Sequence, residues 1–275
     1  MSGFFLYRTF ARENAPAFKE FAAKMYLRLA PAVIFVALLG GALLLWKVNF
    51  NIFLLMDSKY GLNLRDKAPV FYVVIWYVSS YFWWGLLIYW LLKNFETKKL
   101  LPFFAMAAYV CLFAAYQEYP MAMKYTYRAF SALGLGVITG YMSPHISFAK
   151  GRAWRVLFTL VEIGAFCYIV RAGRAEIWNY VAAMIMLLLV AHNAGFFSSW
   201  LNRQKWITFF SKYAYSMYVA QGLAVIGLKK YALGAPPYSP SAYAWVILTD
   251  IVLAVIIYHL VEKRFIKKEM QSQKG

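Results

Sequence analysis

The sequence predicts an all-α transmembrane helical bundle, and three observations support that prediction. Hydrophobic residues make up 63% of the 275 residues, whereas a soluble domain contains roughly 45–50%. Charged residues make up only 15%, against about 25% in a soluble domain. The apolar residues also form continuous runs close to the ~20 residues that a membrane-spanning helix needs. One buried core cannot hold this many apolar side chains, so we expect a polytopic membrane protein with about eight spans.

The N-terminal part differs from the rest of the chain. Residues 1–7 are apolar but too few to cross a bilayer, so we expect them to be the tail of a helix. Residues 8–28 form a basic amphipathic segment in which five Lys and Arg side chains outnumber two Glu side chains. Such charge beside an apolar span is typical of a membrane surface. We expect 8–28 to be cytoplasmic and the first long apolar helix to begin at 29.

Eight apolar runs follow in order, at 29–46, 69–92, 100–117, 128–143, 154–171, 176–193, 207–228 and 243–262. The fourth run is short and contains Gly134, Gly136 and Gly140, which allow close contact between helices. The connections are short except 47–68 and 229–242, which contain turn-forming residues. No linker or repeat divides the chain, so we expect one helical domain over residues 1–275.

The net charge of +18 raises the question of a nucleic-acid partner. The Lys and Arg residues lie between apolar runs, which indicates membrane topology and excludes nucleic-acid binding. With eight spans, 19 of the 29 Lys and Arg residues fall on the side that holds both termini. The positive-inside rule then predicts that both termini are cytoplasmic. The lipid bilayer is therefore the first expected partner, and the sequence leaves the oligomeric state open.

Two carboxylates lie inside predicted spans. Glu162 is at the centre of its run, and Asp250 is about a third of the way along the last one. A charged side chain in the membrane is costly and suggests a function, such as accepting a proton or binding a polar substrate. The alternative is a carboxyl group bonded to a neighbouring helix. Both interpretations stay open at both positions.

The three histidines, His145, His192 and His259, fall near the predicted cytoplasmic ends of their helices. No pair has a metal-ligand spacing, so we predict no metal site. His259 and Glu262 are three residues apart and could share a helix face. Each histidine alone is typical of a packed or interfacial residue.

Six short stretches spread over almost the whole chain carry a more specific signal. They contain Ser2-Gly3-Phe4, Lys24 to Arg28 before Pro31, Trp76 to Ser79, Arg128 to Gly136, Tyr215-Ser216-Met217-Tyr218, and Glu262-Lys263. In this order they resemble motifs of the acyltransferase-3 family. The resemblance is to the family's Ser-Gly-Phe-Leu stretch, basic Arg-x-x-x-Arg motif, Trp-x-Leu-Ser motif, Arg–Phe–Leu-Gly span, Tyr-Ser-x-Tyr-Leu stretch and closing Glu-Lys-Pro-Phe.

The resemblance implies a ten-span membrane enzyme that moves acyl groups, often acetyl from cytoplasmic acetyl-CoA, onto glycans and other extracytoplasmic acceptors. We therefore expect an O-acyltransferase, and more narrowly an O-acetyltransferase that modifies a sugar or polysaccharide hydroxyl in the bacterial inner (plasma) membrane. Acetyl-CoA or another acyl-CoA would be the donor substrate, with no permanently bound cofactor. The alternative is a catalytically inactive family member that acts as a membrane transporter or scaffold.

Several family residues have no match in this sequence. The family's first helix carries an Arg and, about ten residues later, the His taken to be catalytic. We find neither, and expect the chain to be truncated, without the first helix and the start of the second. Lys24 stands at the first Arg of the basic motif, Tyr81 at a position often Glu, and Gln221 at a position often His.

The resemblance assigns roles to the remaining residues. Lys24 and Arg28, one helical turn apart, would hold the phosphates of acyl-CoA, although membrane anchoring would explain them equally well. Acyl transfer also needs a base, for which Glu162, His192 and His259 are the candidates, and spacing favours none of them. Arg128 could contact substrate or pair within the span.

Overall fold

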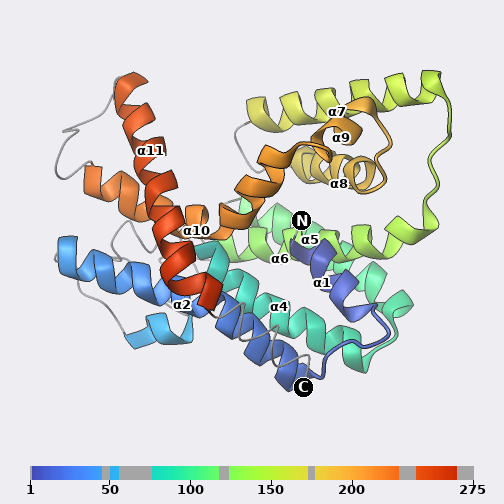
Figure 1. The fold of residues 1–275 in the computed structure, drawn as a ribbon. Coiled ribbons are helices and arrows are strands. Elements are labelled where there is room, and N and C mark those ends of the chain that lie inside the picture. The colour runs from blue at the N-terminus through green and yellow to red at the C-terminus, as the bar shows by residue number, and fades with distance from the viewer. Residues whose placement is uncertain are drawn as a thin grey trace. The chain divides into compact units, whose positions relative to one another are not determined.

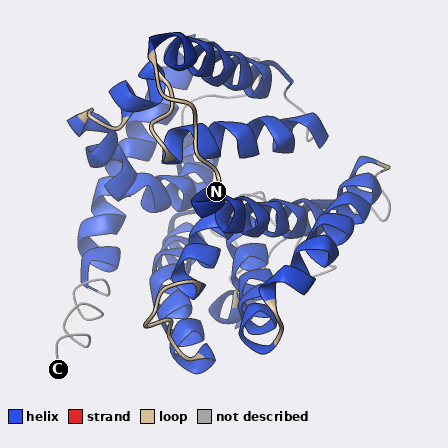
Figure 2. Cartoon of the chain, turned by 90° about the vertical axis from the view of Figure 1, so that its right-hand side faces the viewer, coloured by secondary structure: helices blue, strands red, loops and turns tan. Residues whose placement is uncertain are grey.

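The computed structural model describes residues 2–44, 50–55, 76–117, 124–172, 177–228 and 240–264. Helices and short loops make up this described part, which contains no strand (Figure 2). The all-α prediction is therefore confirmed. Residues 45–46, 69–75 and 176 of the predicted runs lie outside the described residues.

A helix occupies each of the eight predicted ranges (Figure 1). These helices are α2 (Phe18–Leu44), α4 (Trp76–Asn94), α5 (Thr97–Tyr116), α6 (Lys124–Met142), α7 (Arg152–Ala172), α8 (Ile177–Ala191), α10 (Lys205–Leu228) and α11 (Pro240–Ile257) with the π-helical turn η5 (Tyr258–Glu262). The shorter elements are α1 (Ser2–Phe10), α9 (Phe196–Leu201) and the 3-10 turns η1 (Phe50–Leu54) and η3 (Ser143–His145). The sequence did not predict α9, which lies in a stretch interpreted as a loop.

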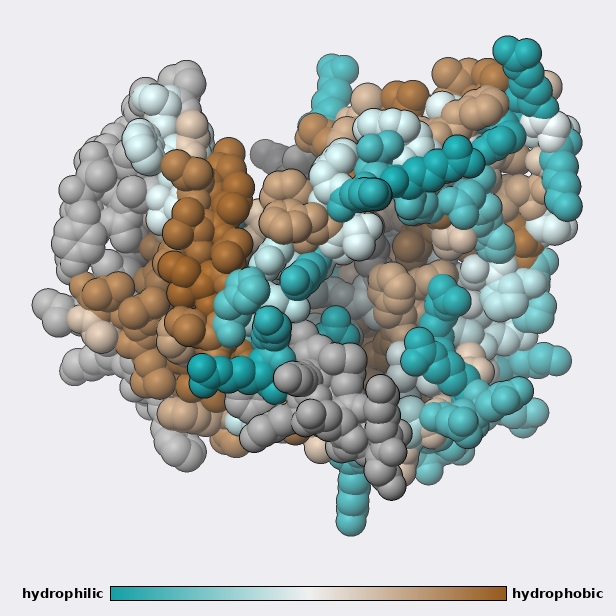
Figure 3. All heavy atoms as spheres, in the orientation of Figure 1, coloured by the Kyte–Doolittle hydropathy of each residue, from teal (hydrophilic) through white to brown (hydrophobic). Residues whose placement is uncertain are grey.

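Four described helices are long and apolar enough to cross a membrane: Phe18–Leu43, Thr97–Tyr116, Arg152–Arg171 and Ser241–Glu262. Many of their apolar side chains are exposed, as the hydrophobic column of α11 shows in Figure 3. The exposed side chains there include Tyr243, Trp245, Ile247, Leu248, Val252 and Ile256. A helix that exposes this many apolar groups is suited to lipid, where its backbone bonds are satisfied internally.

Several helices begin earlier than the sequence predicted, and two of them have a proline in their interior. The run expected from 29 belongs to a helix that starts at Phe18, and the run expected from 100 starts at Thr97. Pro31 and Pro102 both lie inside these helices. A proline removes one backbone donor but leaves the flanking turns intact, and membrane helices tolerate it. The segment 8–28 therefore comprises the end of α1, a loop and the first three turns of α2, and its cytoplasmic location stays a prediction.

The chain divides into two compact units, which are described separately. Unit 1 contains Met1–Phe18 and Trp83–Thr208, and unit 2 contains Lys19–Phe82 and Phe209–Gly275. Helix α4 begins in unit 2 and ends in unit 1, whereas α10 begins in unit 1 and ends in unit 2. The prediction of a single acyltransferase-like domain stays a prediction.

In unit 1, α1 is a helix that packs closely on α6. A Cβ atom added to Gly3 would clash with the carbonyl oxygen of Leu133, and one added to Gly136 would lie 2.9 Å from the Cα atom of Gly3. The two backbones are thus in direct contact, which only glycine permits at these positions. The close helix contact expected at the Gly-rich span is confirmed. It also accounts for the glycine of the Ser2-Gly3-Phe4 motif, because a larger side chain would not fit there.

The loop between α1 and α2 is fastened to the end of α4 within unit 1. The hydroxyl of Tyr89 donates a hydrogen bond of 2.6 Å to the carbonyl of Pro16. The Nζ atom of Lys93 donates one of 3.3 Å to the carbonyl of Ala15. These contacts give the basic N-terminal segment a defined path before α2 begins.

Candidate functional site

Polar side chains from four separate stretches converge in unit 2. They are Arg28 on α2, Tyr81 on α4, Tyr215 and Ser216 on α10, and Glu262 on η5, and we call them the Arg28 cluster. All five come from stretches with family-like motifs, although the sequence placed them up to 234 positions apart. Helix packing in unit 2 is what brings them together.

A buried hydrogen bond lies at the centre of the cluster. The Ser216 hydroxyl donates to Oε1 of Glu262 over 2.8 Å. Ser216 is fully buried and Glu262 is 8% exposed. Glu262 ends the π-helical turn η5, and such turns often occur at functional sites because the extra residue redirects a side chain. A buried carboxylate with this donor is held in one orientation.

Arg28 provides the positive charge of the cluster. Its side chain is exposed, and its charge interacts with the buried Glu262 and with the hydroxyls of Tyr81 and Tyr215. An exposed guanidinium near a buried carboxylate is reachable by a ligand and feels the charge of that carboxylate. Five N–H donors in a planar fork suit it to phosphate or to a developing oxyanion.

Tyrosines fix the helices around Arg28. The Tyr215 hydroxyl donates a hydrogen bond of 2.6 Å to the carbonyl of Leu29, which joins α10 to α2. Tyr218 is hydrogen-bonded to the backbone of Tyr77, and their rings meet edge to face at 6.3 Å. Tyr77 also stacks on Tyr81, with centroids 6.1 Å apart. The sequence treated Tyr81 as a departure from the family, and the structure places it in the cluster.

The other motif residues on these helices have different surroundings. Lys24 lies one turn before Arg28 on the same helix, as expected, but its Nζ atom is bonded to Oε1 of Glu20 at 2.6 Å. Ser79 is 2% exposed, and the ring of Trp76 packs edge to face on that of Tyr77 at 5.6 Å. The proposed contact of Lys24 with acyl-CoA stays a prediction.

Glu162 is fully buried in unit 1 and faces the start of α9. Its Oε2 atom accepts a hydrogen bond of 3.1 Å from the backbone N–H of Ser198. One turn earlier on α7, Thr159 accepts one of 2.8 Å from the N–H of Phe196. A Cβ atom on Gly195 would lie within 2.8 Å of the Glu162 carboxyl. The carboxyl group thus caps the first turn of α9, a helix that the sequence did not reveal.

The two histidine candidates are exposed and have different neighbours. In unit 1, Nε2 of His192 lies 3.2 Å from the hydroxyl of Ser143, and its ring meets that of Phe148 at 5.4 Å. In unit 2, Nε2 of His259 lies 3.5 Å from the hydroxyl of Tyr213. His259 therefore belongs to the unit that holds the Arg28 cluster, and none of the base assignments is tested by these contacts.

Several polar groups within predicted spans have a buried atom without a hydrogen-bond partner among the described residues. They include Nε of Arg128 and the second carboxyl oxygen, Oε1, of Glu162 in unit 1, and Oδ1 of Asp250 in unit 2. The Arg128 guanidinium lies 5.6 Å from the centre of the Tyr125 ring, which gives it cation–π stabilisation. Asp250 keeps both interpretations open.

Residues 1–260 match the model of the acyltransferase domain that defines acyltransferase-3. The chain belongs to the acyltransferase-3 family. No curated protein and no solved structure matches it. It is therefore a membrane protein of an acyltransferase family, and the match covers α2, α4 and α10 of the Arg28 cluster and ends within η5, before Glu262.

Proposed function

We propose that this acyltransferase-3 protein is an O-acyltransferase that moves an acetyl group from acetyl-CoA to a sugar or polysaccharide hydroxyl. The observation that supports it most strongly is the Arg28 cluster, where an exposed guanidinium stands beside a buried carboxylate held by Ser216. Acyl-CoA carries several phosphate charges, and an oriented Arg is the side chain best suited to hold one.

The reaction transfers one acyl group from the sulfur of CoA to the oxygen of the acceptor hydroxyl. The hydroxyl oxygen attacks the thioester carbonyl carbon, the carbon–sulfur bond breaks, and CoA leaves as a thiolate that takes up the proton released from the hydroxyl. The hydroxyl proton passes to a base, for which Glu162, His192 and His259 stay the candidates. Arg28 would bind a donor phosphate or stabilise the carbonyl oxygen as negative charge develops there. Glu262 would act through Arg28 as a positioning residue.

The proposed location follows from charge and from the donor. Acyl-CoA is cytoplasmic, and the positive-inside rule puts the basic segment 8–28 and both termini on that side. Arg28 ends this segment and would face the donor pool. We propose the bacterial inner (plasma) membrane as the site of the reaction and an extracytoplasmic saccharide as the acceptor.

The experiment compares Arg28→Ala with Arg12→Ala in membranes that contain equal amounts of protein. Arg12 is an exposed residue of the same basic segment, so it controls for membrane anchoring. We expect Arg28→Ala to lower transfer from acetyl-CoA at least tenfold, mainly through a higher KM for the donor, with Arg12→Ala unchanged. Unchanged transfer by Arg28→Ala would remove this residue from the site.

The alternative function is that of an inactive family member acting as a transporter or scaffold. Tyr81 and Gln221 support it, because both replace ionisable side chains often present in the family. Transfer of label from acetyl-CoA that depends on this protein would exclude it.

A further inference from the structure

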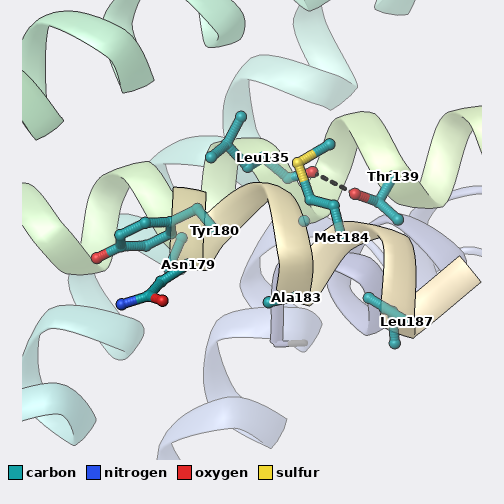
Figure 4. Close-up of a pocket in the computed structure, with 9 residues that line it drawn as sticks. Leu135, Thr139, Asn179, Tyr180, Ala183, Met184 and Leu187 are labelled. Atoms are coloured by element: carbon teal, nitrogen blue, oxygen red, sulfur yellow. Dashed lines mark hydrogen bonds between the residues drawn. The ribbon is translucent and has the colours of Figure 1, made fainter. Parts of the chain in front are cut away.

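A cavity of about 310 Å³ lies between α6 and α8 in unit 1. Its lining is mainly apolar and comes from one face of each helix (Figure 4): Ala132, Leu135, Gly136, Thr139, Asn179, Tyr180, Ala183, Met184 and Leu187. The side chains of Ala132 and Ala183 and the missing side chain of Gly136 leave the space open. This volume is at the lower end of the ~300–1,000 Å³ typical of ligand sites.

The cavity is a groove that opens to the surroundings of the helix pair, because Ala183 in its wall is exposed. The lining residues recur every three to four positions along both helices, so the groove runs lengthwise along them. Apolar cavities exclude water and take up apolar ligands. In a membrane, the apolar ligand available to such a groove is the hydrocarbon chain of a lipid.

One end of the groove is polar. In Figure 4, Asn179 and Tyr180 lie at one end, Thr139 and Leu187 at the other, and Leu135 between them. Arg128 precedes the lining residue Ala132 by one turn, about 6 Å along α6, on the side of Asn179 and Tyr180. Its buried Nε–H has no acceptor among the described residues. A cation with an unused donor thus stands beyond the polar end of an apolar groove.

We propose that this groove binds an anionic phospholipid, with one acyl chain lying between α6 and α8 and the phosphate at Arg128. The chain accounts for the apolar walls, and the phosphate supplies the acceptor that Arg128 needs. The groove shares no residue with the Arg28 cluster, and the proposal does not depend on the proposed acyl transfer. The experiment that tests the proposal measures lipid binding and not acyl transfer.

The test uses photo-cross-linking in lipid nanodiscs with phosphatidylglycerol that carries a diazirine on one acyl chain. We expect cross-links at Met184 and Leu187. Ala183→Trp fills the groove and should reduce this labelling at least fivefold, as should Ala132→Leu from the α6 side. Ile185→Trp is the control, because Ile185 lies on α8 outside the groove and is 41% exposed.

A second arm tests the phosphate end. A phosphatidylcholine probe with the same diazirine should label the groove less than phosphatidylglycerol does, and Arg128→Gln should abolish that preference without removing the chain cross-links. Labelling spread evenly over exposed α8 residues such as Trp178, and unchanged by both filling variants, would show boundary lipid only and overturn the proposal. An undiminished preference in Arg128→Gln would refute the role of Arg128.

Discussion

The buried hydrogen bond between Ser216 and Glu262 gives the sharpest prediction. Ser216→Ala removes the donor to a buried carboxylate, a bond of 2.8 Å, and hydrogen bonds to charged groups contribute about 1.5–3 kcal/mol. Glu262→Gln keeps an oxygen that accepts from Ser216 but removes the negative charge that interacts with Arg28, and we propose that this charge positions the guanidinium. We therefore expect Ser216→Ala to lower the free energy of unfolding by about 2 kcal/mol, and Glu262→Gln to lower it by less than about 1 kcal/mol.

For Glu262→Gln we expect a small loss of stability but a large loss of activity. If orienting Arg28 stabilises the transition state by about 2 kcal/mol, its loss lowers kcat/KM for acetyl-CoA roughly 30-fold. The assay measures transfer of labelled acetyl at varied donor concentration, and unfolding is followed in detergent by tryptophan fluorescence. Glu20→Gln is the matched control, because its ion pair with Lys24 is exposed and such pairs contribute only about 0–1 kcal/mol.

The reasoning would be refuted by a Glu262→Gln protein that is folded and transfers acetyl at the rate of the unchanged protein. Equal losses of activity in Glu262→Gln and Glu20→Gln would also contradict it, because general loss of negative charge would then explain the effect.

Three further predictions concern packing and capping. Gly136→Ala should lower the free energy of unfolding by about 1–3 kcal/mol, because its Cβ would meet the Gly3 backbone at 2.9 Å; Gly134→Ala, whose nearest neighbours are at 3.6 Å, should not, and urea titration separates the two. Glu162→Ala should cost about 0.5–2 kcal/mol through loss of the α9 cap, whereas Glu162→Gln should keep stability; a folded but inactive Glu162→Gln would make Glu162 the base, and full transfer would leave His192 and His259. Tyr215→Phe should cost about 0.5–1.5 kcal/mol by removing one hydrogen bond, and an unchanged unfolding midpoint would argue against that bond.

The sequence predicted the helices well because their signal is local. Each apolar run is long, and in a membrane its backbone N–H and C=O groups must bond to one another, which favours a helix whatever the rest of the chain does. Helix ends were less predictable, since Pro31 was taken to mark a start and lies inside α2. The helical nature of residues 1–7 was predicted and is confirmed from Ser2 onward by α1, but the existence of α9 was missed, because α9 depends on partners elsewhere in unit 1.

The candidate site could be predicted only in part. The family motifs identified Arg28, Tyr215, Ser216 and Glu262 one by one, but spacing along the chain cannot show that four helical stretches converge. Glu162 illustrates the opposite problem. Its position in mid-span suggested catalysis, yet its carboxyl group meets the backbone of Ser198, a partner 36 positions away whose N–H has no sequence signature.

The most direct test of the account is the transfer of radiolabelled acetyl from acetyl-CoA in bacterial inner-membrane vesicles with and without this protein. We expect label to appear in an alkali-labile ester on saccharide only when the protein is present, and to fall when Arg28 is replaced by Ala. Saccharide that stays unlabelled at full protein levels, or labelling that does not depend on the protein, would contradict the proposal that the chain is an active O-acyltransferase.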